Sequence, residues 1–281
     1  MKIIKNIFEF IEYRNKLSKK IALVPTMGSI HEGHLSLVDT AKQYGEIIIA
    51  TIFINPMQFN SSEDYKSYPK DFDQDKEILQ NRGVDILFCP SISEIYPDGF
   101  DTTIKVDFLS ELLEGKYRKD HMEGVATVVT KLFNIILPDY AIFGEKDFQQ
   151  LFLIKSFVKD LNVPVKIISS KTIRDKDGLA LSSRNIKLNP DERNIATEIN
   201  KSLIMGVEKI LLGEKNSKNI IEYIRIYLSS FNLIKIEYVS IRNPKTFEVI
   251  NKINKEFVIL IAAYVGNIRL IDNIIIEEKN G

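Results

Sequence analysis

IALVPTMGSIHEGHLSLV, at residues 21–38, passes from an apolar run into a helical pattern and holds two of the three histidines of the chain. The apolar run at residues 21–25 predicts a buried strand, and apolar positions at helical spacing predict a helix over residues 33–44. His31 and His34 therefore flank the first turn of the predicted helix. A strand that leads directly into a helix is typical of α/β proteins.

The same alternation continues outward from this segment. Short apolar runs predict strands at residues 46–55, 84–90, 140–144 and 165–169, and helical patterns fill the intervals at residues 71–82, 122–137 and 147–160. Apolar strands separated by helices form a parallel sheet that is covered on both faces. The sequence therefore predicts a doubly wound, Rossmann-like parallel-sheet domain at residues 1–171.

A different pattern begins near residue 172. Two helical patterns, at residues 190–212 and 217–230, precede alternating runs at residues 234–241, 256–265 and 268–276. Alternation of this kind predicts an antiparallel sheet with one covered face. Residues 172–281 are therefore expected to form a smaller α+β domain.

The composition limits the classes of partner. The chain has 281 residues, of which 44% are hydrophobic, and its 38 basic residues equal its 38 acidic ones. This balance argues against nucleic acid or an anionic membrane as the main partner. The longest apolar stretch, at residues 257–265, is far shorter than the roughly 20 residues of a membrane helix. The single cysteine, Cys89, indicates a reducing cytoplasm, and its apolar run predicts an inert core thiol.

The two histidines suit the phosphates of a nucleotide. The free N–H groups and positive dipole end of a helix start attract anions, and imidazole N–H groups would add donors there. Gly33 allows the backbone to approach a ligand closely. Two other interpretations stay open. One histidine could cap the helix while the other packs on the sheet, or both could bind zinc, for which His121 and scattered carboxylates show no ligand spacing.

Two further polar segments follow strand candidates and are expected at the same edge of the sheet. The first, NPMQF at residues 55–59, combines the amides of Asn55 and Gln58 with an apolar wall, which suits a small polar molecule. The second, GEKDFQQ at residues 144–150, places Lys146 where it could neutralise phosphate charge. Parallel α/β sheets bind their ligands at the carboxyl ends of the strands.

A fourth segment, DGLALSSRN at residues 177–185, lies in the second domain. Ser182, Ser183 and Arg184 form a short polar fork, and a guanidinium matches phosphate geometry with paired donors. The loop could close as a lid over a nucleotide held by the first domain. An ordinary serine-rich turn is the alternative interpretation.

VPTMGSIHEGHLSLV, IFINPMQF, FGEKDFQQL and DGLALSSRN, in this order, resemble the signature segments of the pantothenate synthetase (pantoate–β-alanine ligase) family. This family belongs to the HxGH nucleotidyltransferase group, which is related in fold to class I aminoacyl-tRNA synthetases. The resemblance extends from about residue 20 to about residue 275, where AAYVGNIRLIDN is also similar. It implies a ligase that joins pantoate to β-alanine.

The resemblance also implies the course of the reaction. The pantoate carboxylate attacks the α-phosphorus of Mg²⁺-bound ATP, and the amine of β-alanine then displaces AMP from the pantoyl adenylate. The nucleophiles belong to the substrates, so catalysis depends on alignment and charge stabilisation. The family further implies a homodimer formed through the first domain, with no nucleic acid or membrane partner.

Site residues follow from the matching positions. The family pattern makes four residues catalytic: His34, His31, Lys146 and Arg184. His34 is the residue that the family treats as the proton donor to the leaving pyrophosphate. The ATP site would include Met27, Gly28, Ser29, Ile30, His31, Glu32, Gly33, His34, Gly144, Glu145, Lys146, Asp147, Ile173, Leu181, Ser182, Ser183 and Arg184. Gln58 would bind pantoate and β-alanine, Gln150 would bind pantoate, and Asn55, Met57 and Arg118 would complete the substrate site.

Three positions depart from the family pattern. Lys70 replaces the arginine of a family YPR segment, and the stretch before His121 lacks the usual Pro-Gly, which affects the placement of Arg118. The acidic pair of the next helix aligns with Gln74 and Asp75. Asp75 is therefore the expected Mg²⁺ ligand, and Asp73 is a possible substitute.

Two alternative functions stay open at this point. An adenylyltransferase of the same superfamily would explain the HxGH segment, but it gives no reason for NPMQF together with FGEKDFQQ. A nucleotide-binding regulator without activity would retain the fold, but the presence of both histidines, Lys146 and Arg184 argues against it.

Overall fold

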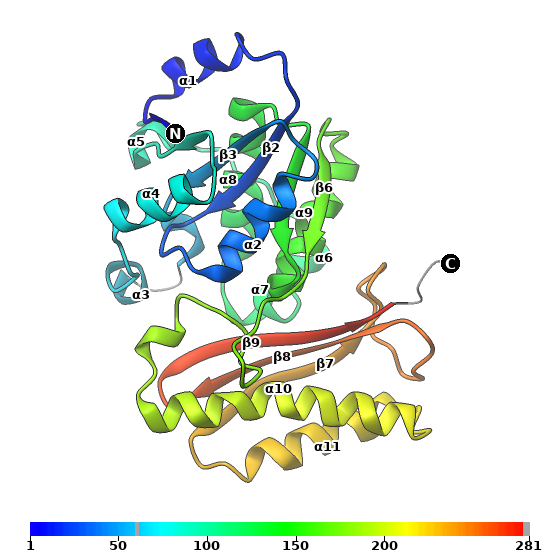
Figure 1. The fold of residues 1–281 in the computed structure, drawn as a ribbon. Coiled ribbons are helices and arrows are strands. Elements are labelled where there is room, and N and C mark those ends of the chain that lie inside the picture. The colour runs from blue at the N-terminus through cyan, green and yellow to red at the C-terminus, as the bar shows by residue number, and fades with distance from the viewer. Residues whose placement is uncertain (60–61, 278–281) are drawn as a thin grey trace. The chain divides into compact units, whose positions relative to one another are not determined.

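The parallel sheet predicted for the first part of the chain is present, with the five predicted strands and a sixth strand at one edge that was not predicted. A computed structural model describes residues 1–59 and 62–277 and divides the chain into two compact units, Met1–Lys171 and Thr172–Gly281. The first unit contains the strands β1 (Lys2–Ile4), β2 (Ile21–Thr26), β3 (Ile47–Ile52), β4 (Ile86–Phe88), β5 (Tyr140–Gly144) and β6 (Lys166–Ser170). All neighbouring strands are parallel, in the order β1-β4-β3-β2-β5-β6 (Figure 1).

Helices cover both faces of this sheet, which is why its strands are apolar on both sides. One face carries α2 (Glu32–Ala41) and α4 (Phe72–Asn81), whose Val38 and Leu79 pack with Val24 and Ala50 of the central strands. The other face carries α1 (Ile7–Arg14), α8 (His121–Ile136) and α9 (Phe148–Asp160). On that side the rings of Phe133 and Phe143 pack 6.4 Å apart.

The strand order has a switch point beside β2. From β2 the chain builds outward through β3 and β4 on one side, and later through β5 and β6 on the other. In doubly wound sheets, ligands bind where the order reverses, beyond the carboxyl ends of the strands. The loops after β2 and β5 are therefore the expected ligand edge.

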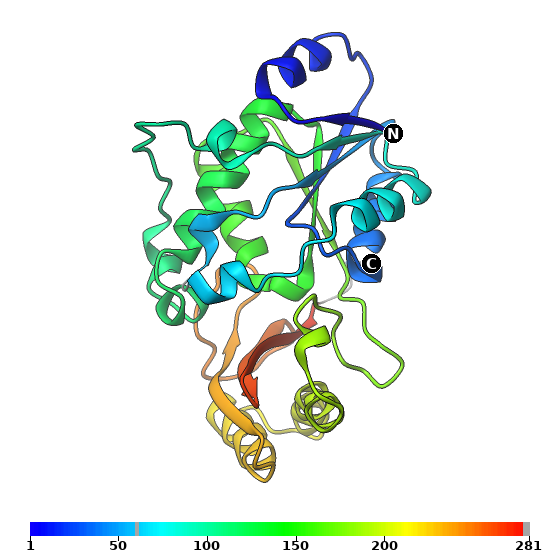
Figure 2. The same ribbon diagram turned by 90° about the vertical axis from the view of Figure 1, so that its left-hand side faces the viewer.

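The second unit is the predicted α+β layer. Its antiparallel strands are β7 (Ile234–Arg242), β8 (Phe257–Val265) and β9 (Ile268–Ile276), in that order. Helices α10 (Pro190–Leu211) and α11 (Ser217–Ser229) lie side by side on one face of this sheet. Figure 2 shows both helices nearly end-on. Asn189 and Glu192 form a capping box at the start of α10.

Several short elements were not predicted. They are the edge strand β1, the short helices α3 (Ser62–Lys66), α5 (Ile92–Ile95), α6 (Asp107–Ser110) and α7 (Glu114–Tyr117), and the 3₁₀ helices η1 (Pro56–Gln58), η2 (Glu145–Asp147) and η3 (Asn185–Lys187). Each has three to five residues, which is too short for a periodic pattern to register. Within the described ranges, no helix is both long and apolar enough to cross a bilayer.

Candidate active site

Three of the predicted segments meet at one edge of the first sheet. The histidine segment follows β2, η1 follows β3, and η2 follows β5. The strands β3, β2 and β5 are neighbours in the sheet and run parallel. The carboxyl ends of these strands therefore bring the three segments together at the switch point, as the sequence predicts.

His31 and His34 form the first turn of α2 as a reciprocal cap. His31 is the N-cap residue, and its Nδ1 accepts a hydrogen bond from Gly33 N–H at 3.1 Å. The Nδ1 of His34 accepts the N–H of His31 at 3.4 Å, and the two rings lie 4.1 Å apart. A backbone N–H can only donate, so each Nδ1 is unprotonated and the proton of each neutral ring is on Nε2. Capping and ligand binding are therefore compatible, because each ring keeps an Nε2–H donor.

Electrostatics keeps both rings neutral. Burial, followed by the positive charge of Lys146, lowers the pKa of His31 to about 4. Burial also lowers the pKa of His34 to about 3, with further contributions from His31 and Lys146. Lys146, at the end of β5, is thus close enough to act on both imidazoles. The site therefore offers an anion the neutral donors of both imidazoles and the ammonium of Lys146, which also lies 3.6 Å from Asp147 Oδ1.

This neutrality predicts that the histidine contribution to stability declines as the pH falls. The unfolded chain protonates His34 near its ordinary pKa of 6.5, whereas the folded protein resists until about pH 3. The stabilisation is complete above pH 6.5 and is lost between pH 6.5 and 3. At pH 5 the loss is about 2 kcal/mol for one ring.

The measurement is the free energy of unfolding in urea at pH 7 and pH 5, for the wild type and for His34→Asn. The asparagine Oδ1 can take the place of Nδ1 in the cap, but asparagine does not titrate in this range. The difference between the two proteins should shift in favour of the variant at pH 5. An unchanged difference would show that His34 does not resist protonation.

Asp75 holds the loop that leads into the histidines. Its carboxylate, 4% exposed on α4, accepts the N–H of Ser29 at 2.8 Å and the N–H of Ile30 at 2.7 Å. Ser29 and Gly28 have φ angles of 54° and 83°, so this loop is left-handed. A Cβ on Gly28 would lie 2.9 Å from Asp75 Oδ2, which leaves room only for glycine. Burial raises the pKa of Asp75, and the two backbone hydrogen bonds oppose that rise.

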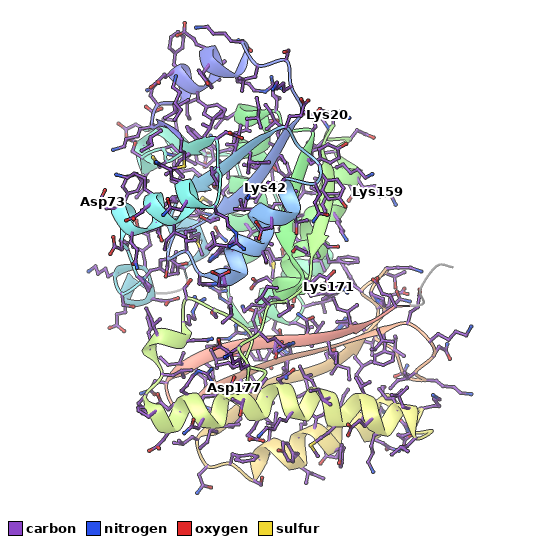
Figure 3. The ribbon with its side chains drawn as sticks, in the orientation of Figure 1. Lys20, Lys42, Asp73, Lys159, Lys171 and Asp177 are labelled. Atoms are coloured by element: carbon purple, nitrogen blue, oxygen red, sulfur yellow. The ribbon has the colours of Figure 1, made fainter. Side chains whose placement is uncertain are left out.

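The predicted magnesium role of Asp75 therefore stays a prediction. Both of its oxygens accept a backbone N–H, so its observed role is to hold the loop before α2. Asp73 is 89% exposed and pairs with Lys76, and its side chain points away from the protein in Figure 3. Among the residues that the structure describes, no cluster of three histidine, cysteine, aspartate or glutamate side chains could hold a metal.

The turn after β3 brings the substrate-site candidates together. Asn55 is fully buried and bonds Gln58 Oε1 at 3.0 Å, and it caps η1 by accepting Met57 N–H. Arg118 and His121, from the other side of the turn, bond the carbonyl oxygen of Gln58 at 3.1 and 2.8 Å. The structure thus connects Arg118 to the Gln58 turn, despite the missing Pro-Gly.

In the segment after β5, two neighbouring glutamines have different surroundings. Gln149 is buried, and its amide bonds the backbone of Glu114, Leu109 and Leu112, so it holds the loop around α7. Gln150 makes no side-chain hydrogen bond to any residue in the described ranges and is only partly buried. The structure therefore leaves Gln150, rather than Gln149, available to a substrate.

Two other residues from the sequence analysis, Glu32 and Lys70, have exposed side chains that contact neighbouring residues. Glu32 is exposed and lies 3.8 Å from Arg82, so any contact of Glu32 with a nucleotide at α2 would come from its backbone. Lys70 is exposed, and its ammonium lies 4.8 Å from the ring centre of Tyr65. Neither side chain is held in the histidine cap.

The remaining candidates belong to the second unit, in the loop between β6 and α10. Leu181 N–H bonds the carbonyl of Ile173 at 3.0 Å, which closes a hairpin around Gly178. Arg174 bonds both carboxylate oxygens of the buried Asp272, which ties this loop to β9. Ser182, Ser183 and Arg184 continue from this fixed base into η3.

A salt bridge on the same loop was not predicted. Arg193 of α10 bonds Asp175 and Asp177, the latter labelled in Figure 3. Sequence reasoning also missed Tyr96, whose hydroxyl bonds Asn55 at 2.8 Å. These pairs join positions 16 to 41 residues apart, and no short motif signals them.

A parallel doubly wound sheet with a histidine-capped helix start at its switch point defines an α/β protein that presents hydrogen-bond donors to an anion at its ligand edge. A family model described as pantoate-beta-alanine ligase matches residues 2–275. The chain belongs to the pantoate–β-alanine ligase family.

The chain resembles its relatives, in sequence and in structure, over nearly its full length. The chain is 46% identical over 276 residues to a pantothenate synthetase of Thermoanaerobacter pseudethanolicus, covering 98% of each chain. A crystal structure of pantothenate synthetase from Thermus thermophilus matches with a TM-score of 0.92 and 37% identity, over 98% of this chain and 99% of that one.

A second solved structure is a ligand complex. It is a pantoate-beta-alanine ligase from Francisella tularensis, complexed with beta-gamma ATP and beta-alanine. It matches with a TM-score of 0.80 and 39% identity, over 98% of this chain and 97% of that one.

Proposed function

We propose that this chain joins pantoate to β-alanine in an ATP-dependent ligation that forms pantothenate, AMP and pyrophosphate. The observation that carries the proposal is the pair of Nε2–H donors at the start of α2, within the electrostatic reach of Lys146. Family membership over residues 2–275 supports the two organic substrates. The ligands of the Francisella tularensis enzyme support ATP and β-alanine.

In the first step, a pantoate carboxylate oxygen attacks the α-phosphorus of ATP. A new P–O bond forms, the bond to the bridging oxygen breaks, and pyrophosphate leaves with the bonding electrons. Negative charge accumulates on the phosphate oxygens, where the start of α2, the Nε2–H groups of His31 and His34, and the Lys146 ammonium would stabilise it. His34 enters as a neutral ring, so proton transfer to pyrophosphate requires the arriving phosphates to raise its pKa and the ring first to take up a proton from solvent.

In the second step, the amine of β-alanine attacks the carbonyl carbon of the pantoyl adenylate. The C–N bond forms, the C–O bond to the AMP phosphate breaks, AMP leaves with the bonding electrons, and the proton of the amine passes to solvent. Gln58 and Gln150 would hold pantoate at the edge formed by β3 and β5, and the backbone around Gly144 to Asp147 would contact the nucleotide. No protein nucleophile is required, so the site works by alignment.

The second unit carries groups that suit the phosphates of ATP. Arg184 and the two serines before it offer a guanidinium, two hydroxyls and backbone N–H groups to phosphates. Ile173 and Leu181, joined by a backbone hydrogen bond, offer an apolar contact for the nucleotide. Magnesium is expected with the phosphates of ATP. We further propose a homodimer formed through the first unit, acting in the cytoplasm.

Pyrophosphate exchange tests the order of the two steps. The purified protein, with ATP and pantoate, should incorporate labelled pyrophosphate into ATP, and β-alanine should not be needed. Exchange that requires β-alanine would contradict a free-standing adenylation step. An adenylyltransferase would give adenylated product without amide, and full assays with all three substrates separate it from the ligase.

A further inference from the structure

The side-chain amide of Gln58 has its orientation imposed by Asn55. Gln58 is 8% exposed, and its Oε1 accepts a hydrogen bond from Asn55 Nδ2 at 3.0 Å. An isolated glutamine could present either its carbonyl oxygen or its NH₂ group to a ligand. Which group faces the substrate therefore depends on whether Asn55 itself can turn over.

Asn55 cannot turn over without breaking two bonds to backbone groups. Its Oδ1 accepts Met57 N–H at 3.3 Å, and its Nδ2 donates to the carbonyl of Gly124 at 3.0 Å. A backbone N–H only donates and a carbonyl only accepts, so each end of the Asn55 amide is assigned. Asn55 is fully buried, where an unsatisfied polar group is costly.

Tyr96 adds a third constraint on the same amide. Its hydroxyl lies 2.8 Å from Asn55 Oδ1, and because that oxygen only accepts, the hydroxyl donates. The Tyr96 ring packs between Phe53 and Phe100, with ring centres 6.0 and 5.0 Å away. Burial raises the pKa of Tyr96, with the Asn55 hydrogen bond opposing the rise, so the hydroxyl keeps its proton.

The backbone of Gln58 is held as firmly as its amide. Its carbonyl oxygen accepts from His121 Nδ1 at 2.8 Å and from Arg118 at 3.1 Å. The guanidinium also lies 3.1 Å from His121 Nε2, and since Arg118 only donates, that nitrogen carries no proton. Gly124 permits this close packing, because a Cβ there would lie 2.4 Å from the carbonyl oxygen of Met57.

The Nε2 group of Gln58 takes no part in this hydrogen-bond network. Throughout residues 1–59 and 62–277, no group accepts a hydrogen bond from it. Its Oε1 is already engaged by Asn55. The network thus turns the oxygen of Gln58 toward Asn55 and leaves its two N–H donors for a ligand.

We infer that Asn55 and Tyr96 are positioning residues that fix the Gln58 amide so that its NH₂ group, rather than its oxygen, faces the substrate. The position then selects an oxygen acceptor, a carboxylate or hydroxyl, and disfavours an ammonium group. This rests on the proposed ligase function, and within it assigns Gln58 to the oxygens of pantoate. It directs the amide oxygen of Gln58 toward Asn55 and away from the amine of β-alanine.

Gln58→Glu tests the direction of the donor. Glutamate keeps the shape and can still accept from Asn55, but its second oxygen would face the substrate oxygens and repel them. Pantoate affinity, measured by calorimetry on the unliganded protein, should fall by roughly 100-fold or more, because a donor is replaced by an anionic acceptor. Unchanged pantoate affinity, with an unchanged thermal midpoint, would overturn the inference.

Tyr96→Phe tests the positioning role by comparing the KM for pantoate with the KM for ATP. Losing one hydroxyl bond should raise the KM for pantoate roughly three- to tenfold and leave the KM for ATP unchanged. The matched control is Tyr227→Phe in the second unit, which also loses a hydroxyl hydrogen bond, to Glu198, and should leave the pantoate KM as in the wild type. Equal changes in all three substrate constants would indicate a structural role only and would overturn the inference.

A double-mutant cycle separates action through Gln58 from other effects. In a Gln58→Met background the Tyr96→Phe change should have no further effect on the KM for pantoate, since the amide it orients is gone. An undiminished effect of Tyr96→Phe in that background would contradict the proposal that Tyr96 acts through Gln58. Failure of the wild type to make pantothenate from the three substrates would instead overturn the proposed function, which keeps the two failures distinguishable.

Discussion

His34→Ala is expected to lower the rate of pantoate-dependent pyrophosphate exchange by roughly 100-fold or more. The variant loses the Nε2–H donor at the start of α2, where the leaving pyrophosphate gathers charge. Its stability should change little, because the Nδ1 cap that is lost is a long bond of 3.4 Å and a cap is worth about 1 kcal/mol. The measurements are the exchange rate and the thermal midpoint.

Two further substitutions separate the cap from the donor. His34→Asn can keep an acceptor where Nδ1 lies but has nothing at the place of Nε2, so its exchange rate should be as low as that of His34→Ala. His34→Gln can bring an amide N–H toward the place of Nε2, so it should retain more activity than His34→Asn. The exchange rates of both variants, compared at equal folded fraction, test this order.

The opposite pattern would assign His34 to structure. A large fall in the thermal midpoint of His34→Ala together with unchanged turnover would mean that the ring serves only the first turn of α2. Full activity in all three variants would revive a site that binds a nucleotide without catalysing its reaction.

Strands and helices with strong periodic patterns were predictable in this chain. The three central strands of the first sheet and the long helices of the second unit agree with the expected ranges to within a few residues. The strand β1 was missed, because three residues at a sheet edge carry no periodic signal and follow directly into α1. Its pairing with β4 depends on contacts 84 residues away, which no local pattern encodes.

The site was predictable only as far as its motifs extend. The motifs predicted that His31, Gln58 and Lys146 follow strands that end at the same edge of the sheet, because the carboxyl ends of parallel strands share an edge. They could not show how the side chains are oriented, since this depends on partners such as Tyr96 and Asp75, which are 41 and 46 residues distant from the groups they bond. The tautomers of the histidines likewise follow from bonds that only the fold reveals.

Asp75→Asn is expected to lower kcat/KM for ATP by roughly 100-fold, because the loop before α2 loses its anchor. An asparagine has one acceptor oxygen where the carboxylate accepts two N–H groups, those of Ser29 and Ile30. One buried N–H would face an NH₂ group, at a cost of about 1–3 kcal/mol. The left-handed loop at Gly28 and Ser29 would relax, and His31 and His34 would lose their alignment.

The control lies two residues earlier on the same helix. Asp73→Asn removes the same charge from an exposed side chain and should leave kcat/KM near the wild-type value. Varying magnesium then distinguishes the two roles of Asp75. If the carboxylate anchors the loop, excess magnesium will not restore Asp75→Asn, because the lost bonds are to backbone N–H groups. Recovery of activity at high magnesium, or an equal loss in Asp73→Asn, would assign the acidic end of α4 to the metal and contradict the anchoring role.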